Sequence, residues 1–140
     1  GGLTNDAAGD TYQGIENVTG SDFGDIIVGN GSNNRLEGGD GNDFLSGGFG
    51  NDVLIGGNGV DTLLGGDGDD RLDGGGNTTI NGVDNGSTMT GGLGHDTFVV
   101  KFDLFVIGDT FITDFQRGVD ILEVGIVAGD FGADGRLAIG

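Results

Sequence analysis

The residues best suited to chemistry in this sequence are aspartates that return every nine positions. Each stands sixth in the pattern Gly-Gly-x-Gly-x-Asp-x-apolar-x, which four consecutive segments carry without a gap and a fifth carries further on. The five segments are Gly38–Ser46, Gly47–Ile55, Gly56–Leu64, Gly65–Asp73 and Gly91–Val99. A carboxylate at a fixed phase beside three glycines places an oxygen ligand in a turn whose backbone can curl tightly, so the pattern indicates binding of a hard cation.

Weaker copies extend the phase of nine upstream of these segments. Asn34 stands at the aspartate position of residues 29–37, and Asp25 stands at that position in residues 20–28. We interpret these two copies as degenerate outer coils, which are expected where a repeat array ends. Before them, residues 1–19 are expected to form an N-terminal cap. Their first six residues imitate the turn one residue out of phase, as either a further coil or an irregular segment.

The pattern also weakens downstream. Residues 74–90 are one residue short of two repeats, and Thr or Ser replaces the aspartate at the sixth position of each. We interpret them as two further degenerate copies that have largely lost the metal, with a surface loop as the alternative. After Val99 the glycine phase ends, so the roll of coils is expected to span residues 20–99 and a C-terminal β cap residues 100–140. The cap strands are predicted from their Val, Ile, Phe and Thr content at Val100–Ile107, Asp109–Phe115 and Val119–Val127.

Composition excludes several classes of protein. The 140 residues, one domain's length, include 35 glycines but no proline, which excludes collagen, and no cysteine, which excludes disulfides and thiolate metal sites. A net charge of −18 argues against nucleic acid and against an anionic membrane surface. No apolar run approaches the ~18 residues of a membrane-spanning helix. The chain has no signal peptide and begins at Gly1 without methionine, so we expect a fragment of a larger protein.

The spacing also predicts how the turns are arranged. The first six residues of a repeat are expected to form a turn and the last three a short strand, whose middle apolar residue points inward. One repeat then makes half a coil, so the turns of every second repeat stack on one edge. Asp43 is expected over Asp61, Asp52 over Asp70, Asp25 near Asp43 and Asn34 near Asp52. Stacked carboxylates repel each other unless a cation lies between them, and calcium fits better than magnesium, which resists dehydration. The predicted fold is all-β, a right-handed parallel β-roll with a C-terminal β cap.

The nonapeptide repeats resemble a known family, the RTX (repeats-in-toxin) calcium-binding β-rolls. These occur in type I secreted bacterial proteins such as serralysin-type proteases, lipases and haemolysins. The downstream segments Asp96–Val99, Asp109–Phe115 and Gly118–Leu122 are similar to the segment that caps such rolls, and Glu16–Gly20 to the one that precedes them. The resemblance implies several bound calcium ions, a secreted, extracellular bacterial protein and passage through the type I secretion machinery.

The resemblance also implies a ligand set of carboxylates and backbone carbonyls. Typically the carbonyls at positions 2 and 4 act with the aspartate of one turn, and those at positions 1 and 3 with the aspartate of the stacked turn. One site would then use Gly39, Gly41 and Asp43 with Gly56, Asn58 and Asp61, and the next Gly48, Gly50 and Asp52 with Gly65, Asp67 and Asp70. Asp25 and Asp96 are further candidate ligands. The site at Asn34 is expected to be weak, and those above Asp61 and Asp70 incomplete.

The predicted function is a calcium-binding module that folds on meeting extracellular calcium and supports secretion and stability of a larger exported protein. The alternative is a spacer or attachment module of an RTX adhesin or surface-layer protein. An ice-binding face is disfavoured, because the outward positions of residues 38–73 hold no regular threonine ladder. No catalytic group is expected, since His95 is the one histidine and stands at a variable turn position. We expect a monomer.

Overall fold

The computed structural model describes residues 11–13, 16–75, 86–102 and 110–126, and all regular structure in them is β. No helix occurs in these ranges, and therefore none there could cross a membrane. The strands are β1 (Thr11–Gln13), β2 (Asn17–Thr19), β3 (Ile26–Val28), β4 (Arg35–Asp40), β5 (Phe44–Phe49), β6 (Val53–Asn58), β7 (Thr62–Asp67), β8 (Arg71–Asp73), β9 (Thr88–Leu93), β10 (Thr97–Phe102), β11 (Phe111–Ile112) and β12 (Ile121–Ile126).

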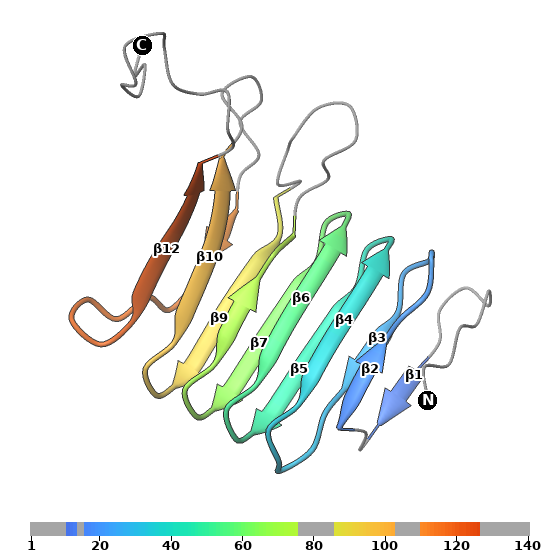
Figure 1. Ribbon diagram of the computed structural model, residues 1–140, viewed down its shortest axis with the longest axis horizontal. Helices are drawn as coiled ribbons and strands as arrows, with labels where there is room; N and C mark the ends of the chain where they lie inside the picture. Colours follow the sequence, from blue (N-terminus) through green and yellow to red (C-terminus); the bar gives the residue numbers. More distant parts are fainter. Residues whose placement is uncertain (1–10, 14–15, 76–85, 103–109, 127–140) are drawn as a thin grey trace, which may run out of the picture.

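The strands form two parallel sheets that the chain visits alternately (Figure 1). One sheet has the order β1-β3-β5-β7-β9-β11 and the other β12-β10-β8-β6-β4-β2. In the middle of the roll, stacked residues are 18 apart in sequence, as in the pairs Leu36↔Leu54 and Leu45↔Leu63. Each coil therefore uses two repeats, one for each sheet, and the predicted parallel β-roll is confirmed.

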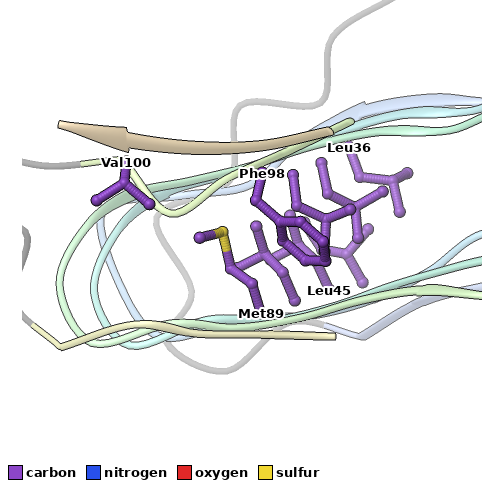
Figure 2. Close-up of a cluster of buried hydrophobic side chains, with 9 residues drawn as sticks. Leu36, Leu45, Met89, Phe98 and Val100 are labelled. Atoms are coloured by element: carbon purple, nitrogen blue, oxygen red, sulfur yellow. The ribbon is translucent and has the colours of Figure 1, made fainter. Parts of the chain in front are cut away.

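The core is a single column of side chains between the two sheets. The eighth residues of the repeats alternate between the sheets and are fully buried: Ile27, Leu36, Leu45, Leu54, Leu63, Leu72, Met89 and Phe98. Figure 2 shows Leu36 and Phe98 pointing from one sheet toward Leu45 and Met89 on the other. One apolar residue per repeat is a thin core, so burial in this column is the main apolar contribution to stability.

Most strands in the middle of the roll are longer than the three residues predicted, although β8 is not. Strands β4 to β7 and β9 each have six residues, because the ladder continues from the apolar triplet into the first three residues of the next repeat. Gly39 pairs with Gly57, and Gly48 with Gly66. The turn proper is thus reduced to about half of the six residues expected. Glycine allows this, since it lacks a side chain that would separate neighbouring layers.

The prediction of two further repeats in residues 74–90 is corrected. Leu63 pairs with Met89 and Leu72 with Phe98, and the layers that they join are 26 residues apart in sequence instead of 18. Strand β9, which belongs to the second expected copy, therefore takes the place beside β7 that the first copy was expected to fill. This agrees with the loop alternative for part of the segment; residues 76–85 themselves lie outside the described part.

The ends of the roll add one layer at each side. Strand β1 pairs with β3, and β2 pairs with β4, so the N-terminal segment supplies a strand to each sheet. The turn-like residues 1–6 lie outside the described residues. At the other end, β11 pairs with β9 and β12 with β10, both in parallel. The described residues of the expected C-terminal cap thus continue the roll; residues 103–109 and 127–140 lie outside them.

Candidate metal centre

The sixth residues of the repeats line the two long edges of the roll. We call first edge the turns that end at Asp25, Asp43, Asp61 and Ser87, and second edge those that end at Asn34, Asp52, Asp70 and Asp96. All eight residues are at most 3 % exposed. They are buried because each precedes a strand and points into the stack from the edge, beside the apolar column.

A ladder of hydrogen bonds runs along each edge through these residues. The backbone N–H of Asp43 donates to Oδ1 of Asp61 at 2.9 Å, and that of Asp52 donates to Oδ1 of Asp70 at 2.8 Å. The same bond joins Asp25 to Asp43, and Asn34 to Asp52. The structure therefore confirms the expected stacking of these pairs. One oxygen of each carboxylate is held by the neighbouring turn on the N-terminal side.

The other oxygen points toward the next turn on the C-terminal side. Oδ2 of Asp43, Asp52, Asp70 and Asp96 is buried and has no hydrogen-bond partner. A methyl group on Gly38 would lie 2.2 Å from Asp43 Oδ2 and 2.5 Å from the carbonyl oxygen of Gly56. Both oxygens thus face one small space between stacked turns, and only a residue without Cβ leaves it open. A buried oxygen without a hydrogen-bond partner raises the free energy of the folded state unless a cation or a proton binds to it.

The same arrangement recurs along the second edge. A methyl group on Gly47 would lie 2.2 Å from Asp52 Oδ2 and 2.7 Å from the Gly65 carbonyl oxygen. On Gly65 it would lie 2.3 Å from Asp70 Oδ2 and 2.6 Å from the carbonyl oxygen of Gly91. In each case a carboxylate oxygen of one turn and the position-1 carbonyl oxygen of the turn above lie around the same small space. The recurrence follows from the repeat itself.

The other carbonyls implied by the resemblance are partly engaged in the backbone ladder. The carbonyl of Asn58 accepts from the N–H of Gly41 at 2.8 Å, and that of Asp67 accepts from Gly50 at 2.9 Å. Gly39 has φ of +114°, and a methyl group there would lie 2.2 Å from the carbonyl oxygen of Ser21. These residues are brought together in stacked turns as expected, with their carbonyls facing the neighbouring layer.

The two degenerate turns supply their own hydrogen bonds. Oδ2 of Asp25 accepts from the backbone N–H of Ser21 at 2.6 Å and from its hydroxyl at 2.9 Å. Oδ1 of Asn34 accepts from the N–H of Asn30 at 2.8 Å. Asp25 was predicted as a ligand, and the structure places it beneath Asp43 as expected, but with its second oxygen already bonded. The outer turns are therefore less dependent on a cation than the turns of Asp43 and Asp52.

Burial controls the electrostatics of these turns. Burial raises the pKa of Asp43 to about 6, opposed by the N–H of Asp25 and assisted by the charges of Asp61, Asp25 and Asp40. Burial likewise raises the pKa of Asp70 to about 6, with Asp52, Asp96 and Asp69 adding to it. The pKa of Asp52 and of Asp96 is also raised, first of all by burial. Carboxylates that resist ionisation in their folded positions are suited to a cation that restores the charge balance.

The C-terminal ends of the two edges differ. Above Asp61 stands Ser87, whose hydroxyl accepts the N–H of Asp61 at 3.2 Å, so one carboxylate is missing there as expected. Above Asp70 stands Asp96, whose Oδ1 accepts the N–H of Asp70 at 3.0 Å. The expectation of an incomplete partner above Asp70 is therefore wrong. The cause is the loss of one half-coil in residues 74–90, which brings the fifth strict repeat directly over the fourth.

Two sets of residues were missed by the reasoning from sequence. The fifth residues of the turns on the second edge form an outer ladder: Asn33 Oδ1 accepts from the N–H of Asn51, Asn51 from Asp69, and Asp69 from His95. His95 is exposed, as expected. Asp114 and Asp120 bind backbone N–H groups of the last strict repeat. The recurrence of Asn or Asp at position 5 was the signal for the first set.

The donor set fits calcium and does not fit a softer metal. No cluster of three or more His, Cys, Asp or Glu side chains suited to a metal occurs in residues 11–13, 16–75, 86–102 and 110–126. Each inter-turn space instead combines carboxylates with backbone carbonyls, and all-oxygen ligands that include carbonyls are typical of calcium.

Comparison with known proteins supports this donor chemistry. The family model of the RTX calcium-binding nonapeptide repeat (4 copies) matches two overlapping segments, residues 19–54 and 46–80. The matched segments cover the turns from Asp25 to Asp70 on both edges. No curated protein matches the sequence significantly.

Proposed function

Because residues 19–80 are RTX calcium-binding nonapeptide repeats, we propose that this chain is a module whose folding depends on several calcium ions. The observation that carries the proposal is the set of buried Oδ2 atoms without partners at Asp43, Asp52, Asp70 and Asp96. Those of Asp43, Asp52 and Asp70 share a small space with a backbone carbonyl oxygen of the turn above. A calcium ion supplies the positive charge that those oxygens need.

The residues that would hold the ions are those of stacked turns. On the first edge they are Asp43 with the Gly56 carbonyl and Asp61, joined by Gly39, Gly41 and Asn58 from the implied set. On the second edge they are Asp52 with the Gly65 carbonyl and Asp70, joined by Gly48, Gly50 and Asp67. Asp96 stands over Asp70 as a further carboxylate. The bound ion would neutralise the paired carboxylates and join successive coils.

Calcium and folding are linked through this arrangement. The buried column holds one apolar side chain per repeat, and a net charge of −18 opposes a compact state. Ligands that come together only in the folded roll convert binding free energy into folding free energy. Extracellular calcium modules bind at ~10⁻⁴ to 10⁻³ M. The chain would stay unfolded at lower calcium inside a cell and fold outside it, which suits a role in secretion of a larger bacterial protein.

A structural scaffold is the second candidate. The observation in its favour is that hydrogen-bonded ladders and two parallel sheets join successive coils into a regular stack, an architecture that suits a spacer. In a spacer of an RTX adhesin or surface-layer protein, calcium would stiffen a roll that is already folded. For both functions we propose a binding module without catalysis of its own, since the matched family is a calcium-binding repeat.

Far-UV circular dichroism during a calcium titration from chelator separates the two. A cooperative change from coil to β near millimolar calcium, absent with magnesium, is the expected result for the folding module. A full β spectrum in chelator would overturn the folding switch and favour the scaffold. Equilibrium dialysis with elemental analysis, run on the same samples, would overturn both if no calcium is retained.

A further inference from the structure

The two outer faces of the roll differ in charge. Strands β3, β5, β7 and β9 lie side by side in one sheet (Figure 1), followed by β11, and their outward residues stack in two columns. We call these residues, with Thr113 just after β11, the uncharged face: Ile26, Phe44, Thr62, Thr88 and Phe111 in one column, and Val28, Ser46, Leu64, Thr90 and Thr113 in the other. None of these side chains carries a charge, although 20 % of the chain is Asp, Glu, Lys or Arg.

The opposite face of the roll is charged. The same two columns on β4, β8 and β12 hold Arg35, Glu37, Arg71, Asp73 and Glu123. Arg35 forms an ion pair with Glu37, and Arg71 forms one with Glu123 at 2.7 Å. Charged residues are depleted at the centre of protein–protein interfaces. The charged face is therefore suited to water, and the uncharged face is suited to contact.

The uncharged face also leaves large apolar side chains in water. Phe111 is 57 % exposed, Ile26 47 % and Phe44 36 %. Beyond the two columns Gly48 pairs with Gly66, so no side chain projects from that part of the sheet. A flat face of this kind can pack on a second flat sheet at a distance of about 10 Å.

The occupant that the charge pattern favours is the same face of a second copy. A strongly charged partner surface would lose water on contact and meet no opposite charge on the uncharged face. A second copy brings an uncharged face to an uncharged face and buries the exposed aromatic and aliphatic groups of both. A two-fold axis brings one patch together from both subunits, so this single face is sufficient for a closed dimer.

The acidic residues do not lie within this contact. Exposed Asp40, Asp67 and Asp69 lie in the turns at the edges of the roll. The net charge of −18 nevertheless opposes association of two copies, and salt screens such repulsion over about 8–10 Å. Pairing through the uncharged face should therefore strengthen as salt is added. Pairing through the ion-paired opposite face would weaken instead.

The size of the uncharged face fits a reversible dimer. Five strands about 4.8 Å apart and up to about 20 Å long span roughly 24 by 20 Å. Two such faces would together bury about 1,000 Å², which is the lower limit for a specific interface.

We propose that two folded copies of this chain pair through the uncharged face. This differs from the monomer expected from the sequence. The face contains none of the candidate calcium ligands, so the pairing and the proposed function can fail separately. Because only folded rolls pair, the dimer stabilises the folded state, and the calcium concentration at the folding midpoint should fall as chain concentration rises.

The test is the molar mass of the full chain by sedimentation equilibrium in saturating calcium, at low and high chain concentration. Thr62→Glu places a charge in the middle of the uncharged face. The matched control is Thr97→Glu, at a half-buried threonine of the opposite face that stacks on Arg71. Circular dichroism in calcium checks that both variants fold. If Thr62→Glu does not fold, Thr88→Glu in the same column is measured instead.

We expect wild type and Thr97→Glu to approach twice the monomer mass at high chain concentration, and Thr62→Glu to remain a monomer. The calcium midpoint should fall with chain concentration in wild type and stay constant in Thr62→Glu. Wild type that is monomeric at every concentration would overturn the proposal, as would a dimer that Thr62→Glu leaves intact or that only Thr97→Glu abolishes. A wild-type dimer that persists in chelator would support the pairing and overturn the calcium-dependent folding.

Discussion

Asp43 and Asp61 are 18 residues apart in the chain, and the backbone N–H of Asp43 donates to Oδ1 of Asp61 at 2.9 Å. In the folded roll, the turn of Asp43 thereby holds one carboxylate oxygen of Asp61 in place. Oδ2 of Asp43, by contrast, is buried and has no hydrogen-bond partner. A buried oxygen of this kind carries an energetic cost that a cation would remove, which is the physical basis of the calcium-dependent folding that we propose.

The first prediction concerns the space beside the position-1 glycine. In Gly47→Ala the methyl group would lie 2.2 Å from Asp52 Oδ2 and 2.7 Å from the Gly65 carbonyl oxygen. The φ of Gly47 lies outside the left-handed region, so the contacts alone cause the effect. Overpacking of this kind costs about 1–3 kcal/mol. We expect a higher calcium concentration at the folding midpoint by circular dichroism.

Gly31→Ala is the matched control for this variant. No atom lies within 4 Å of a methyl group at Gly31, and its φ is also outside the left-handed region. Its midpoint should equal that of wild type. Equal midpoints for the two variants would show that the inter-turn space is not where calcium acts.

The second prediction is that Asp43→Asn has opposite effects with and without calcium. In chelator at pH 7, the variant removes a buried carboxylate that burial makes costly to ionise, so the metal-free roll should be more stable than wild type. With calcium, the loss of a ligand should raise the midpoint concentration at least about tenfold, or ~1.4 kcal/mol. Calcium titrations at fixed guanidinium concentration measure both. Asp69→Asn, at an exposed position, should change both much less, and a uniform loss of stability in Asp43→Asn would contradict the prediction.

The third prediction tests the core column. Leu54 is fully buried between the sheets, and truncation of such a residue costs about 2–5 kcal/mol. Leu54→Ala should therefore lower the free energy of unfolding by this amount in saturating calcium, measured by guanidinium unfolding. Val60→Ala, at a residue 49 % exposed, should stay within about 0.5 kcal/mol of wild type. A small effect at Leu54 would mean that calcium, and not the column, carries the stability.

The fourth prediction concerns pH in the absence of calcium. The pKa of Asp43 and of Asp70 is raised to about 6 in the folded chain from an ordinary value of 3.8. Between these values the folded state binds more protons than the unfolded state, so the free energy of unfolding falls as pH rises. The contribution is fully present below about pH 4 and lost above about pH 6. Acid should therefore partly replace calcium, and β content in chelator should be higher at pH 4.5 than at pH 7.5.

A double variant separates this effect from the general loss of negative charge in acid. Asp43→Asn with Asp70→Asn removes both groups, and its stability in chelator should change less between pH 4.5 and 7.5. In saturating calcium the dependence should reverse, because the ions require the charged carboxylates. Stability in chelator that rises from pH 4.5 to 7.5 in wild type would contradict the assignment.

The periodicity of the sequence was enough to predict the middle of the roll. Asp at position 6 and an apolar residue at position 8 recur with one phase, so the stacking of Asp43 on Asp61 and the burial of Leu54 followed from counting by nine. The same residue types recur at positions 6 and 8 there, so each layer packs against neighbours like itself. The Ser21 bonds to Asp25 were not predictable in this way, because they depend on one side chain in one turn.

Prediction from the nine-residue period fails where the period is interrupted. The sequence by itself determined the repeat, the edge positions of the aspartates and the apolar column. Only the tertiary structure decided that Met89 pairs with Leu63, that Asp96 stands over Asp70, and that Asp120 stands over Asp96. The physical reason is that strand pairing selects register by burial of Met89 and Phe98 in the column, whatever the length of the chain between layers. Stacked residues are therefore 26 residues apart between Asp70 and Asp96 and 24 apart between Asp96 and Asp120, instead of 18. The nonapeptide pattern does not predict these two separations.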